Sequence, residues 1–560
     1  MTLELIVRPT YGSTMRAAEF KTESRRRTPY PLRRIGLSVG GLIAAALLLS
    51  IGVLNSGQPT RAALAAELVR PGAPAELAAF YDARGDAPLW TKASGIWPFW
   101  TRAQLRPEAA QFASIVAEAL PGEISPAAAQ QALLTIKAAR SGRPKDVVQA
   151  EVALSVALGE YGRAPRGGPG ATGLAFVDPA FDAPASVAEV LQQAAEAPSL
   201  ARRLDAWRDR NPIYTALRKD FAAYHQAWSG LPQVHIPPGP PLTVGVDDDR
   251  VRLLHQRLGV RPQAGMESLF TGQTKAAVLR FQNAHGLQAT GGADTPTLMA
   301  LNAGAAHYER LILANLQRAR LLPPVADGRF ILVNPAAGQL WLYEDAQPKQ
   351  SMRVVVGTRD SPTPMMAGQI DYIVFNPYWE VPADLTRNSI APRVLKNGLA
   401  AFRAEHLEVM SDWSDAAVPL DPAAVDWAAV AAGRLDLRVR QQPGGDNMMG
   451  AVKFMSPNEL GIYLHDTPNK AAFKAPQRLF SAGCVRLERA DNLVAWLFGR
   501  RMADAASLGV DNRIDLETPT PVYITYLTAA PGPHGVSFHP DVYSRDAADL
   551  AALGLAGPRT

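Results

Sequence analysis

Apolar residues follow three patterns along the 560-residue chain. Residues 35–54 form an apolar run without a charge, which at about 1.5 Å rise per residue is long enough to cross a bilayer. From residue 58 to about residue 230, apolar positions recur at helical spacing between Pro and Gly breaks. After Pro324 they alternate in short runs, as in strands. This order predicts a multidomain α+β protein with an N-terminal transmembrane helix, a helical scaffold and a mainly β domain.

The charges beside the apolar run predict its orientation. Five arginines precede it and no comparable basic cluster follows, so the positive-inside rule keeps residues 1–34 in the cytoplasm and exports the rest. The run is longer than a typical signal-peptide core and no small-x-small cleavage site follows it directly, which favours an uncleaved anchor. A cleaved signal peptide and a buried core helix are the alternatives. We therefore expect a single-pass inner-membrane protein whose other domains lie in the periplasm.

The net charge supports this topology and argues against nucleic-acid binding. Residues 1–34 hold eight basic and three acidic residues, a net charge of +5 that equals the net charge of the whole chain. The exported part therefore sums to about zero, although the pI is 9.2. A nucleic-acid footprint needs a basic stripe on a folded domain, which this distribution does not indicate.

A helical scaffold is expected over residues 58–240, up to a Pro-rich boundary, and a compact block of three predicted helices follows at residues 247–302. Within this block, "LRFQNAHGL" and "DTPTLMALN" resemble the small three-helix peptidoglycan-binding module of bacterial wall enzymes. The resemblance implies binding to glycan strands; a three-helix module without a ligand is the alternative. Gly286 is expected to cap the second helix. His255 and His285 are expected to be capping or surface residues rather than metal ligands, because no neighbouring cluster has ligand spacing.

A linker helix is expected at residues 303–325, and the mainly β domain at residues 326–545. "RFILVNPAAGQLWLYE" predicts a hairpin around a Pro-Ala-Ala-Gly turn. Residues 383–440 have helical and mixed character and interrupt the β pattern. Such a long insertion is a candidate lid, and a structural elaboration unrelated to catalysis is the alternative.

Cys484 is the only cysteine of the chain, so no internal disulfide can form. It could be a buried apolar residue, half of an intermolecular disulfide, or a nucleophile. The alternation in "ELGIYLHDT" predicts a strand with Leu460 on the core face and His465 on the opposite face. A loop of eighteen residues then leads to Gly483 and Cys484 in a turn. An imidazole beside a thiol can accept its proton and make it a nucleophile.

"HDT…FSAGCVRLE" resembles the catalytic signature of the L,D-transpeptidases, and the resemblance extends over residues 329–527. With the anchor, the scaffold and the wall-binding block, it matches the large multidomain branch of that family. The resemblance implies a Cys484 nucleophile, a His465 base, and the backbone N–H groups of Gly483 and Cys484 as oxyanion donors. Ser481 and Arg486 occupy flanking motif positions that contact substrate or organise the site.

Two positions depart from the family pattern. Asp466 stands where many members have glycine after the histidine, and Ala482 stands where many have a second histidine, so position 482 cannot supply a second imidazole, which argues against a mechanism that needs two histidines. Further candidates for substrate binding are Tyr378 and Trp379, which are equally compatible with core packing, and Asn447, which is also a typical turn residue.

The expected function is a periplasmic L,D-transpeptidase that forms peptidoglycan cross-links. The resemblance implies that the thiol attacks a tetrapeptide stem, releases D-alanine and passes the acyl group to an amine of a neighbouring stem. No metal and no organic cofactor is implied. The alternatives are an L,D-carboxypeptidase or endopeptidase, in which water takes the acyl group, and a non-catalytic scaffold that binds the cell wall.

Overall fold

The computed structural model describes residues 61–69, 75–94, 102–163, 175–176, 185–322, 328–499 and 507–556. The predicted cytoplasmic tail (1–34) and transmembrane anchor (35–54) lie outside these residues. Across the described ranges, no helix is both long and apolar enough to span a membrane.

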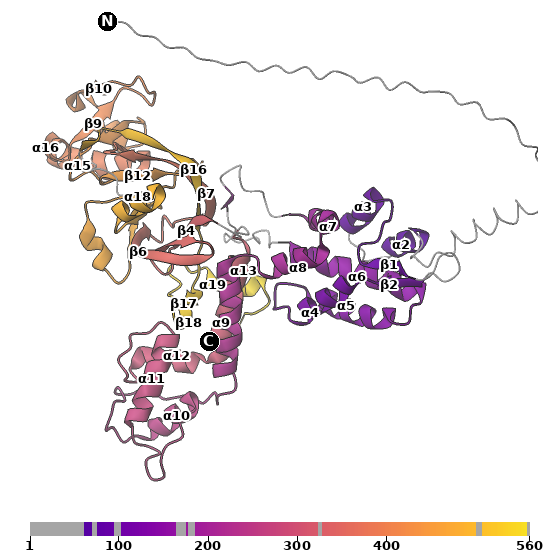
Figure 1. Cartoon of the computed structure of the whole chain (residues 1–560). Helices are drawn as coiled ribbons and strands as arrows, with labels where there is room; N and C mark the ends of the chain where they lie inside the picture. Colours follow the sequence, from indigo (N-terminus) through magenta and orange to yellow (C-terminus); the bar gives the residue numbers. More distant parts are fainter. Residues whose placement is uncertain are drawn as a thin grey trace, which may run out of the picture. The chain divides into compact units, whose positions relative to one another are not determined.

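The N-terminal part is a helical scaffold (Figure 1). Its helices are α2 (Arg61–Leu68), α3 (Ala75–Ala83), α4 (Pro107–Ala117), α5 (Pro126–Ala139), α6 (Pro144–Gly162), α7 (Val187–Glu196) and α8 (Leu200–Arg208). Their apolar faces share one core, in which the rings of Trp90 and Phe112 stack at 5.2 Å. A proline begins α4, α5 and α6, where its missing N–H would have had no helical partner. The short hairpin of β1 (Thr91–Ser94) and β2 (Arg102–Leu105) was not predicted.

Three helices form the next block: α10 (Asp249–Leu258), α11 (Gly272–Ala284) and α12 (Thr295–Ala303). They enclose a core of their own around Phe270 and Val278, both fully buried. Gly286 follows the end of α11 with φ +66°, a left-handed conformation that costs glycine little, so the predicted cap is confirmed.

His255 and His285 were expected to be capping or surface residues; His285 is the C-cap of α11, as one of these roles has it, but neither residue lies on the surface, because both are buried. His255 Nε2 lies 2.8 Å from the hydroxyl of Thr274. Nδ1–H of His285 donates to the Phe281 carbonyl oxygen at 2.8 Å, and its Nε2 accepts from the Tyr224 hydroxyl at 2.9 Å. Burial lowers the pKa of His285 to about 4, so this ring is neutral at neutral pH.

Two long helices, α9 (Pro212–Trp228) and α13 (Ala305–Arg320), pack together and contribute to an apolar core that they share with the β domain. The expected linker helix therefore also packs in the core, since it buries one face against the β domain. A hydrogen bond of 2.8 Å joins the buried Asn315 side chain of α13 to the hydroxyl of Thr528.

The β domain is built on one large sheet. Its strands are β3 (Ala175–Phe176), β4 (Arg329–Asn334), β5 (Gln339–Glu344), β6 (Gln347–Gly357), β7 (Met366–Phe375), β12 (Val452–Met455), β13 (Leu464–His465), β14 (Leu479–Ser481), β15 (Val485–Leu487) and β16 (Asn512–Ile524). The main path runs β12-β13-β15-β6-β5-β4-β16-β7-β3, and β12 also pairs with β7, so the pairing closes on itself. The predicted hairpin is confirmed as β4 and β5, with Asn334 opposite Gln339.

Both faces of this sheet are covered. Along β4, Ile331 and Val333 face a core shared with α18 (Ala490–Phe498), whereas Phe330 and Leu332 face the core shared with α9 and α13. A strand buried on both faces carries a nearly continuous apolar run, which is the pattern of "RFILVN".

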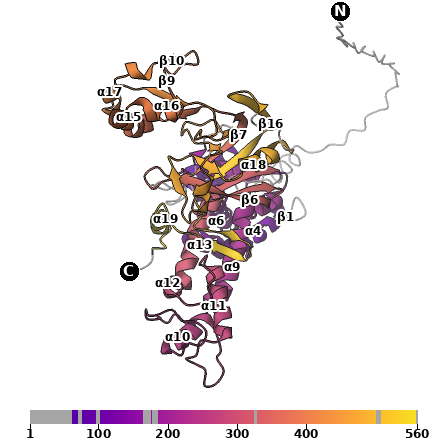
Figure 2. The ribbon, with the colours of Figure 1, turned by 90° about the vertical axis from the view of Figure 1, so that its left-hand side faces the viewer.

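The insertion forms a small unit with its own core (Figure 2). Its elements are α14 (Ala383–Leu385), η1 (Thr386–Ile390), α15 (Ala391–Asn397), α16 (Leu399–Ala404), β9 (Leu407–Met410), β10 (Pro419–Leu420), η2 (Pro422–Ala424), α17 (Trp427–Ala431) and β11 (Arg438–Gln441). A second sheet of order β10-β9-β11-β8 includes β8 (Trp379–Val381). The pairing of β8 with β11 brings the two ends of the insertion together.

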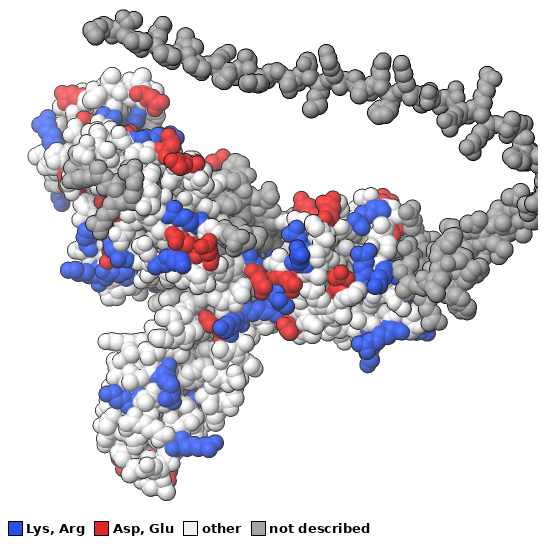
Figure 3. All heavy atoms as spheres, viewed as in Figure 1, with Lys and Arg blue, Asp and Glu red and all other residues white. Residues whose placement is uncertain are grey.

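The C-terminal segment adds the hairpin of β17 (Ala529–Gly532) and β18 (Gly535–Phe538), and the helix α19 (Asp546–Ala552). The hairpin joins the core shared with α9 and α13. On the visible face, basic and acidic side chains are interspersed over the β domain (Figure 3).

Candidate active site

β13 and β15 bring the predicted histidine and cysteine onto one face of the sheet. The two strands are parallel neighbours, with Leu464 opposite Val485 and His465 opposite Arg486. Leu464 and Val485 point into the core, so the alternate residues point to the other face. Two positions before Arg486, Cys484 lies on the same face as Arg486 and diagonally across from His465.

Only part of the predicted strand before His465 exists. β13 covers Leu464 and His465, whereas Leu460 lies in a turn with 46% of its surface exposed. Gly461 has φ +64° there, which ends the alternation. The predicted core role of Leu460 is therefore wrong, but His465 keeps the predicted face.

The turn before Cys484 requires its glycine. Gly483 has φ +115°, a conformation that L side chains rarely adopt. A Cβ on Gly483 would also lie 2.9 Å from the side chain of Ile462. The hydroxyl of Ser481 donates to the Cys484 carbonyl oxygen at 2.6 Å and so closes the turn.

One predicted oxyanion donor is already engaged. The N–H of Gly483 donates to the hydroxyl of Ser481 at 3.2 Å. By contrast, the N–H of Cys484 has no hydrogen-bond partner in the part of the chain that the structure describes. The turn therefore leaves one backbone donor free beside the sulfur, where two were expected. Ser481 is 4% exposed and shapes the turn, so it is not placed to contact a substrate.

His465 is held as a neutral imidazole. Its Nδ1–H donates to the Asp466 carbonyl oxygen at 2.5 Å, which leaves the lone pair on Nε2. Burial, with a smaller contribution from the Arg486 charge, lowers the pKa of His465 to about 3 against the opposing effect of nearby carbonyl oxygens. The ring can accept a proton but does not carry one at neutral pH.

The thiol of Cys484 is also held neutral. Burial raises its pKa, and the Tyr463 N–H and the Arg486 charge oppose this only in part. The thiol donates to the Gly461 carbonyl oxygen at 3.6 Å rather than to His465. At rest the site therefore holds a thiol and an imidazole, and not a thiolate–imidazolium pair.

Arg486 adds a cation to this face of the sheet, and at least one of its N–H donors has no partner among the described residues. Its Nε is buried without a hydrogen-bond partner, and none of the ion pairs between described residues includes it. Burial lowers the pKa of Arg486, against the opposing effect of Cys484. A buried donor without a partner is costly, which indicates that a ligand atom can satisfy it.

Comparison with known proteins identifies the domain that contains these residues. Residues 328–524 match the model of the L,D-transpeptidase catalytic domain, and this stretch contains both β13 and β15. The chain contains an L,D-transpeptidase catalytic domain. Residues 252–301 match a "Putative peptidoglycan binding domain", in line with the resemblance of the three-helix block, and residues 75–220 match a scaffold domain.

A "Putative L,D-transpeptidase" of Haemophilus influenzae is 32% identical over 239 residues, which is 41% of this chain and 47% of that protein. The match thus spans about half of the relative. Similar solved structures include an L,D-transpeptidase from Mycobacterium smegmatis, with 12% identity over 35% of this chain and 58% of that one and a TM-score of 0.17. Another, from Xylanimonas cellulosilytica, has 15% identity over 51% of this chain and 99% of that one, with a TM-score of 0.16.

Asn447 has a structural role in the transpeptidase domain. Asn447 is fully buried, and its side-chain amide donates to the carbonyl oxygens of Pro377, Gln441 and Gln442. Its Oδ1 accepts the N–H of Met449 at 2.8 Å. Every polar atom of this side chain is engaged, so the predicted substrate contact is not supported and the turn role is.

Tyr378 and Trp379 lie where the transpeptidase domain meets the insertion. Trp379 is half-buried and packs on the core of the insertion. The guanidinium of Arg440 lies 4.0 Å from the centre of the Tyr378 ring. Both residues thus have structural contacts, while part of each side chain stays exposed.

Two residues behind the Cys484 turn, Thr363 and Tyr543, could not be predicted from the sequence. The hydroxyl of Thr363 donates to the Gly483 carbonyl oxygen at 2.7 Å, and the N–H of Thr363 donates to the Tyr543 hydroxyl at 3.3 Å. No periodicity or spacing joins positions 180 residues apart. Asp466, whose role was open, accepts from the Lys470 ammonium at 2.5 Å and from the Ala451 N–H at 2.9 Å, and so fixes the end of β13.

Proposed function

We propose that this protein is an L,D-transpeptidase that cross-links peptidoglycan through an acyl-enzyme on Cys484. The observation that carries the proposal is the arrangement on one face of β13 and β15. The only thiol of the chain, a neutral histidine whose Nδ1–H is bonded to the Asp466 carbonyl oxygen, and an arginine with an unpartnered Nε lie on this face.

In the first step, Nε2 of His465 takes the thiol proton while Sγ of Cys484 bonds to the carbonyl carbon before the terminal D-alanine. The carbonyl oxygen becomes an oxyanion, which the free N–H of Cys484 can stabilise. When this intermediate collapses, the C–N bond breaks and the leaving amine takes the proton from His465. D-Alanine leaves, and a thioester remains on Cys484.

In the second step, an amine of a neighbouring stem attacks the thioester carbon. His465 accepts a proton from the attacking amine, the new amide forms, and Sγ leaves and takes the proton back. The enzyme returns to the neutral thiol and imidazole, and no redox change or cofactor is required.

Arg486 is proposed to bind a carboxylate of the stem peptide. A guanidinium matches a carboxylate with two parallel hydrogen bonds, and its position in register with His465 places it beside the reacting bond.

Arg486→Gln should therefore weaken substrate binding about 10–100-fold, the effect expected for a lost charged hydrogen bond. The measurement is KM and kcat for D-alanine release from a disaccharide-tetrapeptide, and KM should carry most of the change. Arg489→Gln is the matched control, because Arg489 is exposed and donates to the Ser351 carbonyl oxygen. If Arg486→Gln and Arg489→Gln have the same KM, Arg486 does not bind the substrate.

The insertion is proposed to cover the site during transfer. Its base is close to the site: burial raises the pKa of Tyr463, the neighbour of Cys484 across the strands, and the charges of Cys484 and of Glu380 on β8 add to this. Glu380 is itself paired with Arg438 of β11 at 2.8 Å. A cover that excludes water favours transfer to an amine over hydrolysis of the thioester.

Hydrogen exchange should find residues 383–440 less protected than β13 and β15 in the free enzyme, and more protected once Cys484 is acylated by a carbapenem-type β-lactam. Removing this segment should raise the ratio of hydrolysed to cross-linked product. Equal exchange in both states, together with an unchanged product ratio, would show that the insertion is a structural elaboration.

The remaining parts fit the same proposal. Residues 35–54 would anchor the protein in the inner membrane, with the catalytic domain in the periplasm, and residues 247–302 would hold glycan strands. Incubation with a disaccharide-tetrapeptide followed by mass analysis tests the whole. Cross-linked dimers support transpeptidation, tripeptides alone support the carboxypeptidase alternative, and unchanged substrate supports the non-catalytic scaffold.

A further inference from the structure

Thr363 holds the peptide unit that carries the free N–H of Cys484. Its side chain is fully buried, and Oγ1 donates to the Gly483 carbonyl oxygen at 2.7 Å while accepting the Gly357 N–H at 2.9 Å. The Gly483 carbonyl and the Cys484 N–H belong to one planar peptide unit, in which they point in opposite directions. Fixing the carbonyl oxygen therefore fixes the direction of the N–H.

Tyr543 in turn fixes Thr363. The Tyr543 hydroxyl donates to the Gly357 carbonyl oxygen at 2.8 Å and accepts the Thr363 N–H at 3.3 Å. It thereby closes the loop that leads from the end of β6 to Thr363. This loop is tight, because a Cβ on Gly357 would lie 2.1 Å from the Ser361 carbonyl oxygen.

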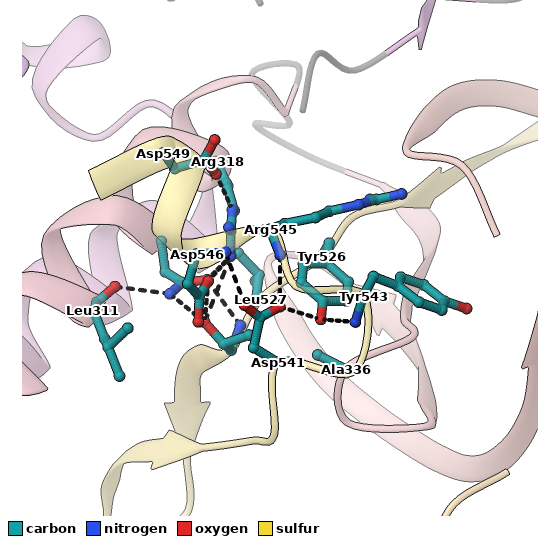
Figure 4. A network of polar contacts seen from close by, with 12 residues as sticks. Leu311, Arg318, Ala336, Tyr526, Leu527, Asp541, Tyr543, Arg545, Asp546 and Asp549 are labelled. Atoms are coloured by element: carbon teal, nitrogen blue, oxygen red, sulfur yellow. Dashed lines mark hydrogen bonds and ion pairs between the residues drawn. The ribbon is translucent and has the colours of Figure 1, made fainter. Parts of the chain in front are cut away.

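The C-terminal segment holds Tyr543 in place (Figure 4). The Tyr543 N–H donates to the Tyr526 hydroxyl at 2.9 Å, and the two rings stack with centres 5.3 Å apart. The Tyr526 hydroxyl donates to Asp541 at 2.7 Å. Asp541 also accepts the N–H groups of Arg545 and Asp546, both at 2.9 Å.

This network ends on α13. Arg318, 2% exposed, forms ion pairs of 2.7 Å with both Asp546 and Asp549 of α19 (Figure 4). A buried cation with two carboxylates holds the geometry firmly, since breaking such a pair leaves an uncompensated charge. Contacts therefore run without a break from α13 through the C-terminal segment to the peptide unit before Cys484.

We propose that Thr363 and Tyr543 are positioning residues that aim the Cys484 N–H at the developing oxyanion. The inference rests on the proposed acyl-enzyme mechanism. It also assigns a role to a segment outside the matched catalytic domain, because Tyr526, Asp541 and Tyr543 all follow residue 524.

Thr363→Val tests the inference in the full-length protein. It keeps the shape of the side chain and removes the donor to the Gly483 carbonyl. Single-turnover acylation by a disaccharide-tetrapeptide should slow about tenfold, less than the ~10²–10³ lost when an oxyanion donor is deleted. Alkylation of Cys484 by iodoacetamide should keep its rate, because displacement at that carbon forms no oxyanion. Thr363→Ser, which keeps the hydroxyl, should restore acylation.

Tyr543→Phe is the second variant, and it should slow acylation in the same direction without changing alkylation. Tyr343→Phe is its matched control. Tyr343 is also buried and stacks on Phe330 at 4.5 Å, but its hydroxyl has no hydrogen-bond partner among the described residues. The control should acylate at the rate of the unmodified protein.

The outcomes separate the inference from the mechanism on which it rests. If the unmodified protein forms no acyl adduct, the proposed function fails. If it does, the inference is overturned when Thr363→Val and Tyr543→Phe both acylate normally, or when acylation and alkylation fall together, or when Thr363→Ser does not recover. Should Thr363→Val fail to fold, Tyr543→Phe against Tyr343→Phe decides.

Discussion

Cys484→Ala should fold and yet form no acyl-enzyme at all, with the tetrapeptide stem left intact. No other side chain of the chain can replace the thiol, because Cys484 is its only cysteine. The loss of one half-buried sulfur from a turn should cost little stability, about 1 kcal/mol. Intact-protein mass after incubation with a disaccharide-tetrapeptide or a carbapenem-type β-lactam measures the adduct.

Phe480→Ala is the control for this experiment. Phe480 belongs to β14, which leads into the Cys484 turn, and is 51% exposed, so its removal tests local disturbance without touching the sulfur. It should still form the adduct. An unfolded Cys484→Ala protein, combined with an unmodified protein that never acylates, would instead favour a cysteine that only packs.

His465→Gln should slow acylation by about 10²–10⁴-fold, the usual contribution of a general base. Glutamine has a similar length and can keep a hydrogen bond to the Asp466 carbonyl, so the fold is retained while the basic nitrogen is lost. Alkylation of Cys484 by iodoacetamide near neutral pH should slow in parallel. An unchanged alkylation rate would remove His465 from the activation of the thiol.

The pH dependence of acylation gives an independent check on the charge state of the pair. The pKa of His465 is lowered to about 3, so its basic form is complete at pH 5 and gains nothing as the pH rises to 8. The pKa of Cys484 is raised, so the thiol ionises to the thiolate only at alkaline pH. The acylation rate should therefore show no inflection near pH 6.5. A sigmoidal rise centred there would indicate a titrating histidine and contradict the neutral pair.

The residues proposed to carry the chemistry could be predicted because the signal is local. His465 and Cys484 belong to short motifs, and alternation along "IYLH" gives the face of the imidazole. What alternation could not give was the length of the strand, because Gly461 breaks the extended backbone one residue after Leu460. Helices α4, α5 and α6 were predictable for a similar reason, since periodicity and N-terminal prolines coincide in them.

Tertiary contacts decided the rest. Whether the Gly483 N–H is free depends on a hydroxyl two residues away, and nothing in the motif says whether that hydroxyl turns inward. His285 was expected to be a capping or surface residue, and its burial depends on Tyr224 of α9, which is far away in the sequence. Likewise, β12 pairs with both β13 and β7, and this closes the sheet. β7 is far from β12 in the sequence, so no local pattern predicts this pairing.

The neutral state of the Cys484 thiol bears on how long the enzyme lasts. Peroxides and disulfides react with thiolates far faster than with thiols. A thiol that stays protonated between turnovers is therefore oxidised more slowly than a thiolate would be. In the proposed periplasmic location, where the chain has no second cysteine for a protective disulfide, this neutral state would keep the proposed nucleophile reduced until a stem peptide binds.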